Sequence, residues 1–276
     1  MSLYSVPTAD FFTVSKYEYK DSATCDFSDC PRPHFCMGLI LDGEADFFPA
    51  EDGAPVHVSV GDIIFVPIAS RYVSVWRGST IRYISYHFSF AENSGISEQN
   101  NFALQKITPP DFEAVKHTFE YAQVHYAGGS DERPATERLT ERLTVLGSFY
   151  ALLASILPLL CHGSDRKHDE RIRRAVEYIR LHSEEDIPIP KLATLCNLST
   201  SHFYTRFKEE VGMTPVDYKN AILVNRAASL LLYGNYDSIE SLASDLGFSS
   251  ATYFRRVFKK VTGKSPRDYR KDAIEL

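Results

Sequence analysis

The sequence lacks the features that mark several large classes of protein. Its five cysteines are odd in number and follow no small-scaffold pattern, which argues against a disulfide framework and favours a reducing compartment. The first residues show no basic segment followed by an apolar run, so we expect no secretory signal. These two absences together predict a cytoplasmic protein.

Long uncharged apolar runs are also scarce. One segment, from Leu143 to Cys161, approaches the length of a membrane span. Small and polar residues such as Gly147 and Ser148 dilute it, and its apolar residues fall on one stripe. Because lipid requires an apolar surface all round, we expect no membrane partner.

The chain is instead long enough for about two domains, and its 44% of apolar residues can supply their cores. The net charge is −6, but residues 1–164 carry −9 whereas residues 165–276 carry +3. A local basic face matters more for phosphate binding than the charge of the whole chain. Basic residues are densest within 251–271: Arg255, Arg256, Lys259, Lys260, Lys264, Arg267, Arg270 and Lys271.

Residues 1–90 follow the period of β-strands. Two apolar runs within residues 35–48 flank Asp42-Gly43, which predicts a hairpin. Further strands are predicted at residues 56–60, 63–66, 71–77 and 81–90. Several short strands at such spacing predict an all-β barrel or sandwich.

The period then changes to that of helices. One helix is predicted at residues 110–127, and a second begins near Pro134 after a break at residues 128–130. The second helix carries a heptad seam that suits a homodimer interface, and the alternative is that the same stripe covers the barrel. The predicted seam is Leu139, Leu143, Leu146, Tyr150, Leu153 and Leu157.

The last third of the chain contains an internal duplication. Ile189-x-x-Leu192-Ala193 recurs fifty residues later, and Phe203 recurs as Phe254 at an offset of 51. In each copy the glycine, asparagine and serine positions predict a helix, a tight turn and a second helix. The predicted turn residues are Asn197 and Gly247, the N-caps Ser199 and Ser249, and the closing glycines Gly212 and Gly263. Thr214-Pro215 and Ser265-Pro266 would begin further helices, and Asp237 with Glu240 predicts a capping box.

One such helix pair would fit any helical scaffold, but two matched copies with a basic cluster favour a DNA-binding domain. The run from Ser249 to Pro266, SSATYFRRVFKKVTGKSP, resembles the signature of the AraC/XylS family of transcription regulators. This resemblance covers about residues 165–276 and implies two helix-turn-helix units joined by a long helix at residues 215–233. The run at residues 61–67, GDIIFVP, is similar to the family's cupin-like sensing barrel.

The predicted fold class is therefore α+β. Residues 1–163 are expected to form a cupin-like β-barrel with a helical dimerisation hairpin, which senses a ligand. Residues 169–276 are expected to form an all-α DNA-binding domain of the AraC type with two helix-turn-helix motifs. Residues 163–168 are the predicted linker between the two domains.

A recognition helix presents its N-terminal half to base edges in the major groove. An arginine there can bind guanine O6 and N7 together, whereas Lys259 and Lys260 are expected to contact phosphates. The alternative is that these side chains merely solvate a helix surface. The predicted DNA-binding residues are Thr200, Ser201, Tyr204, Thr205 and Lys208 in the first unit, and Ser250, Ala251, Thr252, Arg255, Arg256, Lys259 and Lys260 in the second.

The first domain offers no catalytic constellation. Metal-dependent cupin enzymes carry a His-x-His pair, which this chain lacks, so we expect a binding domain with no cofactor and no metal. Trp76, Arg82, Tyr83 and His87 lie on predicted strands and are candidates to line a ligand pocket, with core or rim roles as the alternative.

Four soft ligands, Cys25, Cys30, His34 and Cys36, stand within twelve residues. They suit a zinc or oxidant sensor by type, but their spacing fits no standard zinc pattern, so ordinary thiols are the favoured interpretation.

Together these patterns predict a ligand-responsive, sequence-specific transcription regulator. Its expected partners are double-stranded DNA, an unknown small-molecule effector, a second copy of the chain and RNA polymerase. The alternatives are a cupin-like enzyme or a thiol or metal sensor fused to the DNA-binding module, and an architectural DNA binder without a ligand.

Overall fold

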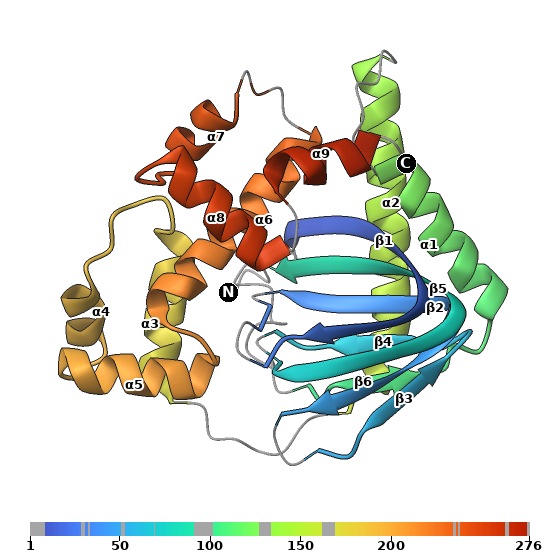
Figure 1. The fold of residues 1–276 in the computed structure, drawn as a ribbon, viewed down its shortest axis with the longest axis horizontal. Helices are drawn as coiled ribbons and strands as arrows, with labels where there is room; N and C mark the ends of the chain where they lie inside the picture. The colour runs from blue at the N-terminus through green and yellow to red at the C-terminus, as the bar shows by residue number, and fades with distance from the viewer. Residues whose placement is uncertain are drawn as a thin grey trace, which may run out of the picture. The chain divides into compact units, whose positions relative to one another are not determined.

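The computed structural model describes residues 9–28, 31–32, 34–50, 53–68, 70–90, 102–126, 134–161, 169–233, 236, 238–262 and 265–274. Contacts divide the chain into a sheet unit, which ends before residue 166, and a helical unit that follows it (Figure 1). The predicted linker at residues 163–168 and the predicted break at residues 128–130 lie outside the described residues.

The sheet unit is built on one antiparallel sheet. Its strands are β1 (Ala9–Asp26), β2 (Phe35–Pro49), β3 (Val56–Ser59), β4 (Ile63–Val66), β5 (Tyr72–Phe90) and β6 (Gln105–Ile107). The order is β1-β5-β2-β4-β6, with β3 paired to β2. Within the described residues β6 and β1 are the two ends of this order, so the predicted barrel is an open, curved sheet (Figure 1).

The hairpin predicted at Asp42-Gly43 is wrong, because β2 runs through this position. Gly43, with φ of +79°, lies against Gly78 of β5, with φ of +150°, and the register shifts twice between Ile40 and Glu44. A Cβ added to Gly78 would stand only 3.0 Å from the Gly43 Cα. These glycines therefore make a bulge that bends two long strands, and the two strands predicted at residues 71–90 are one strand, β5.

Two helices, α1 (Phe112–Tyr126) and α2 (Ala135–Ile156), form in the segments where helical periodicity predicted them. A 3-10 turn at Leu157–Leu159, which contains Pro158, follows α2, so the α-helix ends just before this proline. Both helices pack on one face of the sheet: the Tyr86 ring stacks on Phe119 at 4.1 Å and the Phe88 ring meets Phe149 at 4.9 Å. This aromatic core fixes the helical hairpin to β5.

The predicted seam on α2 divides into two parts. Leu153 is buried, and Leu146, Tyr150 and Leu157 are half-buried against the sheet core. Leu139 and Leu143 near the start of the helix are 56% and 60% exposed. The segment Thr136–Leu159 is also long and apolar enough to cross a membrane by length and composition alone, a test that core helices of soluble proteins pass as well.

The helical unit consists of α3 (Glu170–Leu181), α4 (Ile189–Leu195), α5 (Thr200–Val211), α6 (Pro215–Tyr233), α7 (Ile239–Asp245), α8 (Ala251–Thr262) and α9 (Pro266–Ile274). Two apolar cores lie along it. Tyr218, in the first turns of α6, joins the core built by α3, α4 and α5, whereas Val224 and Ala228 join the core built by α7 and α8. The long helix α6 thus joins the two subdomains, as the family resemblance implied.

Candidate nucleic-acid interface

The first helix-turn-helix unit is formed by α4 and α5. Asn197 occupies the turn with φ of +54°, and the Ser199 side chain caps α5 by accepting from the His202 N–H at 3.4 Å. Phe203 and Phe207 are fully buried in the core below. The turn, cap and core positions predicted for this unit are therefore all confirmed.

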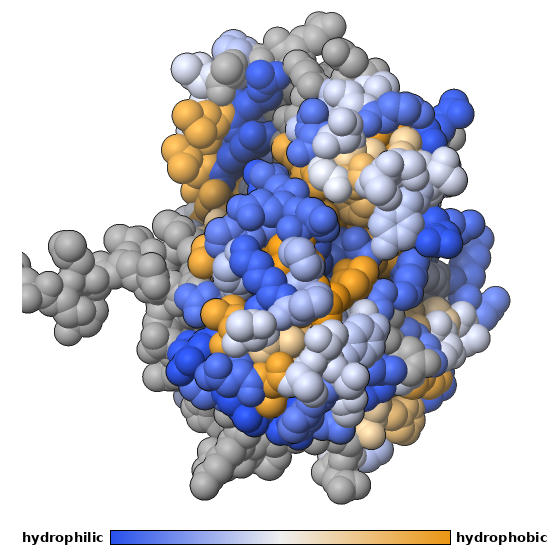
Figure 2. All heavy atoms as spheres, turned by 90° about the vertical axis from the view of Figure 1, so that its left-hand side faces the viewer, coloured by the Kyte–Doolittle hydropathy of each residue, from blue (hydrophilic) through white to orange (hydrophobic). Residues whose placement is uncertain are grey.

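The opposite face of α5 is exposed. Tyr204 is 41% exposed, and the other predicted contact residues are exposed as well: Thr200, Ser201, Thr205 and Lys208. Figure 2 faces the side where α4 and α5 lie and shows mostly hydrophilic atoms, among which hydrophobic residues form separate patches. Among the described residues of its own unit, no element covers the N-terminal half of α5, as a groove-reading helix requires.

The second unit is formed by α7 and α8. Gly247 occupies its turn with φ of +75°, and a Cβ there would meet the Glu184 carbonyl oxygen at 2.7 Å. Only glycine therefore fits this turn, both for its backbone conformation and for its closeness to the α3–α4 connection. Ser238 caps α7 by accepting from the Ser241 N–H at 3.0 Å, whereas Asp237 of the predicted capping box lies outside the described residues.

The N-cap of α8 is Ser250 and not Ser249, which corrects the prediction. The Ser250 Oγ accepts from the Tyr253 N–H at 3.1 Å. Ser250 lies 51 residues after Ser199, the same offset that relates Phe203 to Phe254. The additional residue of the second copy therefore lies in the turn, before the cap. The closing Gly263 and Lys264 lie outside the described residues.

The outer face of α8 carries the basic residues. Thr252, Arg255, Arg256, Lys259 and Lys260 are exposed, as is Ser250. Ala251 is the exception, because it is half-buried and packs against the core of its own subdomain. A role of Ala251 as a base contact therefore stays a prediction.

Three of these cations have partners that sequence reasoning missed. The Arg255 guanidinium pairs with Glu240 of α7 and holds the pKa of that carboxyl below its usual value. The Arg256 guanidinium lies 5.2 Å from the Tyr253 ring centre, and the Lys260 Nζ lies 2.9 Å from the Asp217 Oδ1 of α6. Glu240 and Asp217 lie on other helices, and Tyr253 lies on the flank of α8. The helical periodicity of α8 alone could therefore not reveal these partners.

The two subdomains are also bonded through α6. The Asn220 Nδ2 donates to the Tyr253 Oη at 2.8 Å, and Asn220 is buried. Arg226 pairs with Glu184 at 2.8 Å. These contacts join α6 to α8 on one side and to the α3–α4 connection on the other, which couples the placement of the second unit to that of the first.

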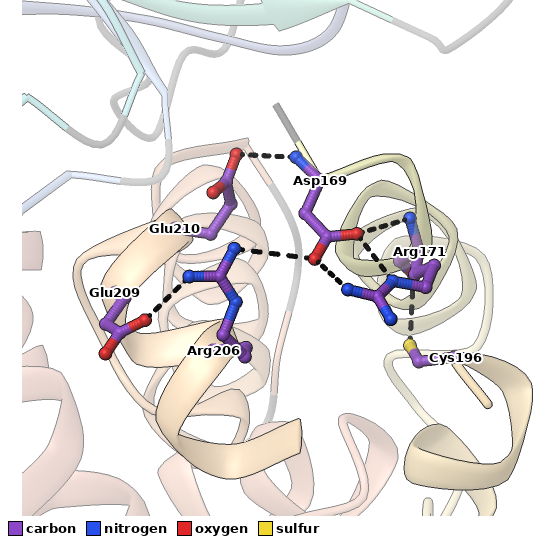
Figure 3. A network of polar contacts seen from close by, with 6 residues as sticks. All are labelled: Asp169, Arg171, Cys196, Arg206, Glu209 and Glu210. Carbon is purple, nitrogen blue, oxygen red and sulfur yellow. Dashed lines mark hydrogen bonds and ion pairs between the residues drawn. The ribbon is translucent and has the colours of Figure 1, made fainter. Parts of the chain in front are cut away.

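A polar network fixes α3 to α5 within the first subdomain (Figure 3). Asp169 caps α3 through the Arg171 N–H at 3.1 Å and binds the Arg171 guanidinium at 2.8 Å and 2.9 Å. Arg206 of α5 lies 3.5 Å from the same carboxylate, and the Asp169 N–H donates to Glu210 at 3.1 Å. The Arg171 guanidinium, with Arg206, holds the pKa of Asp169 well below its ordinary value.

In the sheet unit, three of the four predicted ligand-pocket residues share one face. The Tyr83 ring stacks on the Trp76 ring and on the Tyr17 ring, with ring centres 4.2 Å and 4.6 Å apart. His87, on the same strand, is also buried. Arg82 does not join them, because it alternates to the other face of β5 and pairs with Asp42. Packed rings occupy this face, so Trp76 and Tyr83 act as core residues.

Among the described residues, Cys25 does not join His34 and Cys36 in one group. Cys30 lies outside the described residues, and Cys25 is a free thiol on β1 whose neighbour in register is Ser74. His34 and Cys36 instead come together with His87, which is distant in sequence. The spacing of cysteines and histidines within residues 25–36 could not predict this group, because its third ligand, His87, lies on the paired strand β5.

The comparisons with known proteins agree with this geometry. A helix-turn-helix domain family matches residues 192–272, from within α4 to within α9. An uncharacterized HTH-type transcriptional regulator of Staphylococcus aureus (strain MSSA476) is 32% identical over 238 residues, which are 86% of this chain and 31% of the relative. The MmsAB operon regulatory protein of Pseudomonas aeruginosa is 34% identical over 93 residues, which are 34% of this chain and 30% of that protein. The chain thus spans about a third of the length of the Staphylococcus aureus relative.

The crystal structure of ToxT from Vibrio cholerae O395 has the same fold. Its TM-score is 0.63 at 14% sequence identity, and the match covers 96% of this chain and 99% of that chain. A sheet-rich N-terminal unit followed by a helical unit is therefore an architecture shared with a solved protein. The duplicated helix pair, the matched helix-turn-helix domain and these regulator relatives make the helical unit similar to the helix-turn-helix domains of transcriptional regulators.

Proposed function

We propose that this chain is a sequence-specific DNA-binding transcription regulator that reads two successive major-groove segments of one duplex. One observation carries the proposal: α5 and α8 each bury a Phe-x-x-x-Phe pair and expose the opposite, polar face. A duplicated unit of this kind can place two recognition helices about one helical turn apart. Recognition of DNA would then require no second chain.

The two recognition helices differ in chemistry, so we assign them different parts of the task. Arg255 and Arg256 are the proposed readers of guanine, and Lys259 is the proposed phosphate contact. On α5, Thr200, Ser201 and Thr205 offer hydroxyls for bases or phosphates. The second unit would therefore contribute more of the salt-dependent affinity.

We assign the sensing of a small-molecule effector to residues 1–163 and DNA binding to residues 169–276. ToxT, which shares the fold, has been crystallised with an unsaturated fatty acid bound, and this supports a ligand-binding role for the sheet unit. The effector would act by binding one arrangement of the protein more tightly than another. The proposal also includes a cytoplasmic location and a homodimer joined at the α2 seam. It further includes contact with RNA polymerase and no catalytic activity.

The test is selection of bound fragments from random duplex DNA by the full chain. We expect enrichment of two short conserved segments whose centres lie about 10 base pairs apart. Binding that stays equal for all sequences, at low and at physiological salt, would leave a non-specific or architectural binder and contradict the proposal.

A further inference from the structure

Three metal-ligating side chains meet in the interior of the sheet unit. The His34 Nε2 lies 3.2 Å from the His87 Nδ1, and the Cys36 Sγ lies 3.2 Å from the same nitrogen. All three residues are buried, and their ligand atoms lie within 4.8 Å of one another. The group lies outside the helical unit and has no part in the proposed reading of DNA.

The sheet itself brings the three together. Cys36 of β2 and His87 of β5 are partners in the antiparallel register, so their side chains project from the same face. His34 stands two residues before Cys36, in the bend that precedes β2, and its Nε2 reaches the His87 Nδ1 at 3.2 Å. Long-range pairing thus completes a ligand set of which the local sequence shows only His34 and Cys36.

We propose that His34, Cys36 and His87 bind a zinc ion. Tetrahedral zinc, with Zn–N of about 2.0–2.1 Å and Zn–S of about 2.3 Å, sets ligand atoms about 3.3–3.6 Å apart. The two 3.2 Å separations around the His87 Nδ1 are within a few tenths of an ångström of these values. Binding then requires the His34 Nε2 and the Cys36 Sγ, which lie no more than 4.8 Å apart, to adopt the same range of separation.

A neighbouring hydroxyl orients the central ligand. The Tyr17 Oη lies 3.3 Å from the His87 Nε2, so this nitrogen is occupied and the Nδ1 faces the other two ligands. Metal-bound histidines commonly have their second ring nitrogen held in this way. Tyr17 is in turn stacked on Tyr83 at 4.6 Å, which keeps the hydroxyl in position.

The donor set selects the class of cation. One thiolate and two imidazoles suit zinc and similar soft or borderline ions, whereas calcium and magnesium require oxygen ligands. The Cys36 thiol releases its proton to solvent as the Zn–S bond forms, and both imidazoles bind in the neutral form. Three protein ligands leave the fourth position to water or to an external donor.

Cobalt provides a direct spectroscopic test on the full chain after treatment with a chelator. We expect one Co²⁺ per chain, a thiolate-to-cobalt charge-transfer band, and loss of that band when Zn²⁺ is added. Absence of the band at saturating Co²⁺ would overturn the proposal, and this result requires no variant. Oxidation of Cys36 by peroxide without any such band would point to a thiol sensor instead.

Variants then identify the ligands. The band should disappear in Cys36→Ser and weaken in His34→Gln, while Tyr17→Phe should reduce the affinity about tenfold. Cys25→Ser is the matched control, because it removes a thiol of the same unit that lies outside the cluster. A band that survives Cys36→Ser, or that is lost in Cys25→Ser, assigns the metal to other residues and overturns the proposal.

Discussion

The guanidinium of Arg255 pairs with the carboxylate of Glu240, which ties the recognition helix α8 to α7 of the same helix-turn-helix unit. The two side chains are 47% and 62% exposed, and ion pairs this exposed typically contribute only about 0–1 kcal/mol. Arg255 can therefore leave Glu240 for a base edge at small cost. The pair sets the resting position of the arginine, and two predictions follow from it.

Arg255→Ala should relax the sequence preference at one base position. A bidentate contact from arginine to guanine discriminates by about 1–3 kcal/mol, so affinity for the best site should fall about five- to 150-fold. Repeating the random-DNA selection with the variant measures both effects. Lys259→Ala is the control and should weaken all sequences equally. An unchanged preferred sequence after Arg255→Ala would remove this arginine from base reading.

Glu240→Gln should strengthen DNA binding. The variant frees Arg255 from its partner and removes a negative charge close to the duplex, so affinity should rise about two- to fivefold at low salt. Fluorescence anisotropy of labelled DNA, measured across a salt series, would show the gain shrink as salt rises. Asp245→Asn removes the same charge from the same helix without releasing Arg255. Equal gains of affinity in Glu240→Gln and Asp245→Asn would mean that the effect is only the loss of general repulsion between a carboxylate and the DNA.

Local patterns predicted the helical unit well. The caps at Ser199, Thr214 and Ser265 and the left-handed turns at Asn197 and Gly247 depend only on residues close in sequence. The misplaced cap at Ser249 shows the limit of this reasoning, because an inserted residue shifts a repeat without changing its composition.

The sheet unit was less predictable, because its geometry depends on pairing between distant strands. Asp42-Gly43 has the composition of a hairpin turn, yet Gly43 forms a bulge because Gly78 of β5 lies against it. The His34, Cys36 and His87 group and the Arg255–Glu240 pair have the same origin. Each of them joins residues from two different parts of the chain, and the periodicity of one helix or strand carries no information about such contacts.

Tyr253→Phe should weaken the junction between α6 and α8. The variant removes the acceptor of the buried Asn220 amide, and an unsatisfied buried donor costs about 1–3 kcal/mol. Hydrogen exchange should become faster in α6 and α8 while β5 stays unchanged. Tyr204→Phe removes an exposed hydroxyl and should leave exchange as it was. Equal protection in Tyr253→Phe and the wild type would show that packing alone holds the junction.

Asp169→Asn should lower stability in a pH-dependent way. The folded-state pKa of Asp169 lies well below the ordinary value of 3.8, so its charge stabilises the folded form above about pH 4. This contribution is lost as the pH falls from 3.8 through the lower folded-state value. Asparagine keeps an acceptor for the cap but loses the charge that binds Arg171 and Arg206, which should cost about 1 kcal/mol at pH 7.

Thermal unfolding from pH 7 to pH 3 would measure this difference. The gap between the wild type and Asp169→Asn should be constant down to about pH 4 and narrow below it. Glu209→Gln, which removes the exposed partner of Arg206, should change stability by only a few tenths of a kcal/mol. A gap that widens on acidification would mean that the Asp169 charge does not stabilise this network.

Leu143→Glu should separate the proposed dimer. Leu143 is 60% exposed on α2, so the substitution leaves the sheet core intact while placing a charge in the seam. Each leucine buried at a two-fold contact contributes about 1.5–3 kcal/mol and occurs twice, so self-association should weaken more than a hundredfold. Sedimentation equilibrium measures the dissociation constant directly. Val124→Glu, at an equally exposed position (64%) on α1, is the matched control and should leave the dimer unchanged. If Leu143→Glu sediments like the wild type, the two copies meet elsewhere and the exposed start of α2 has another role.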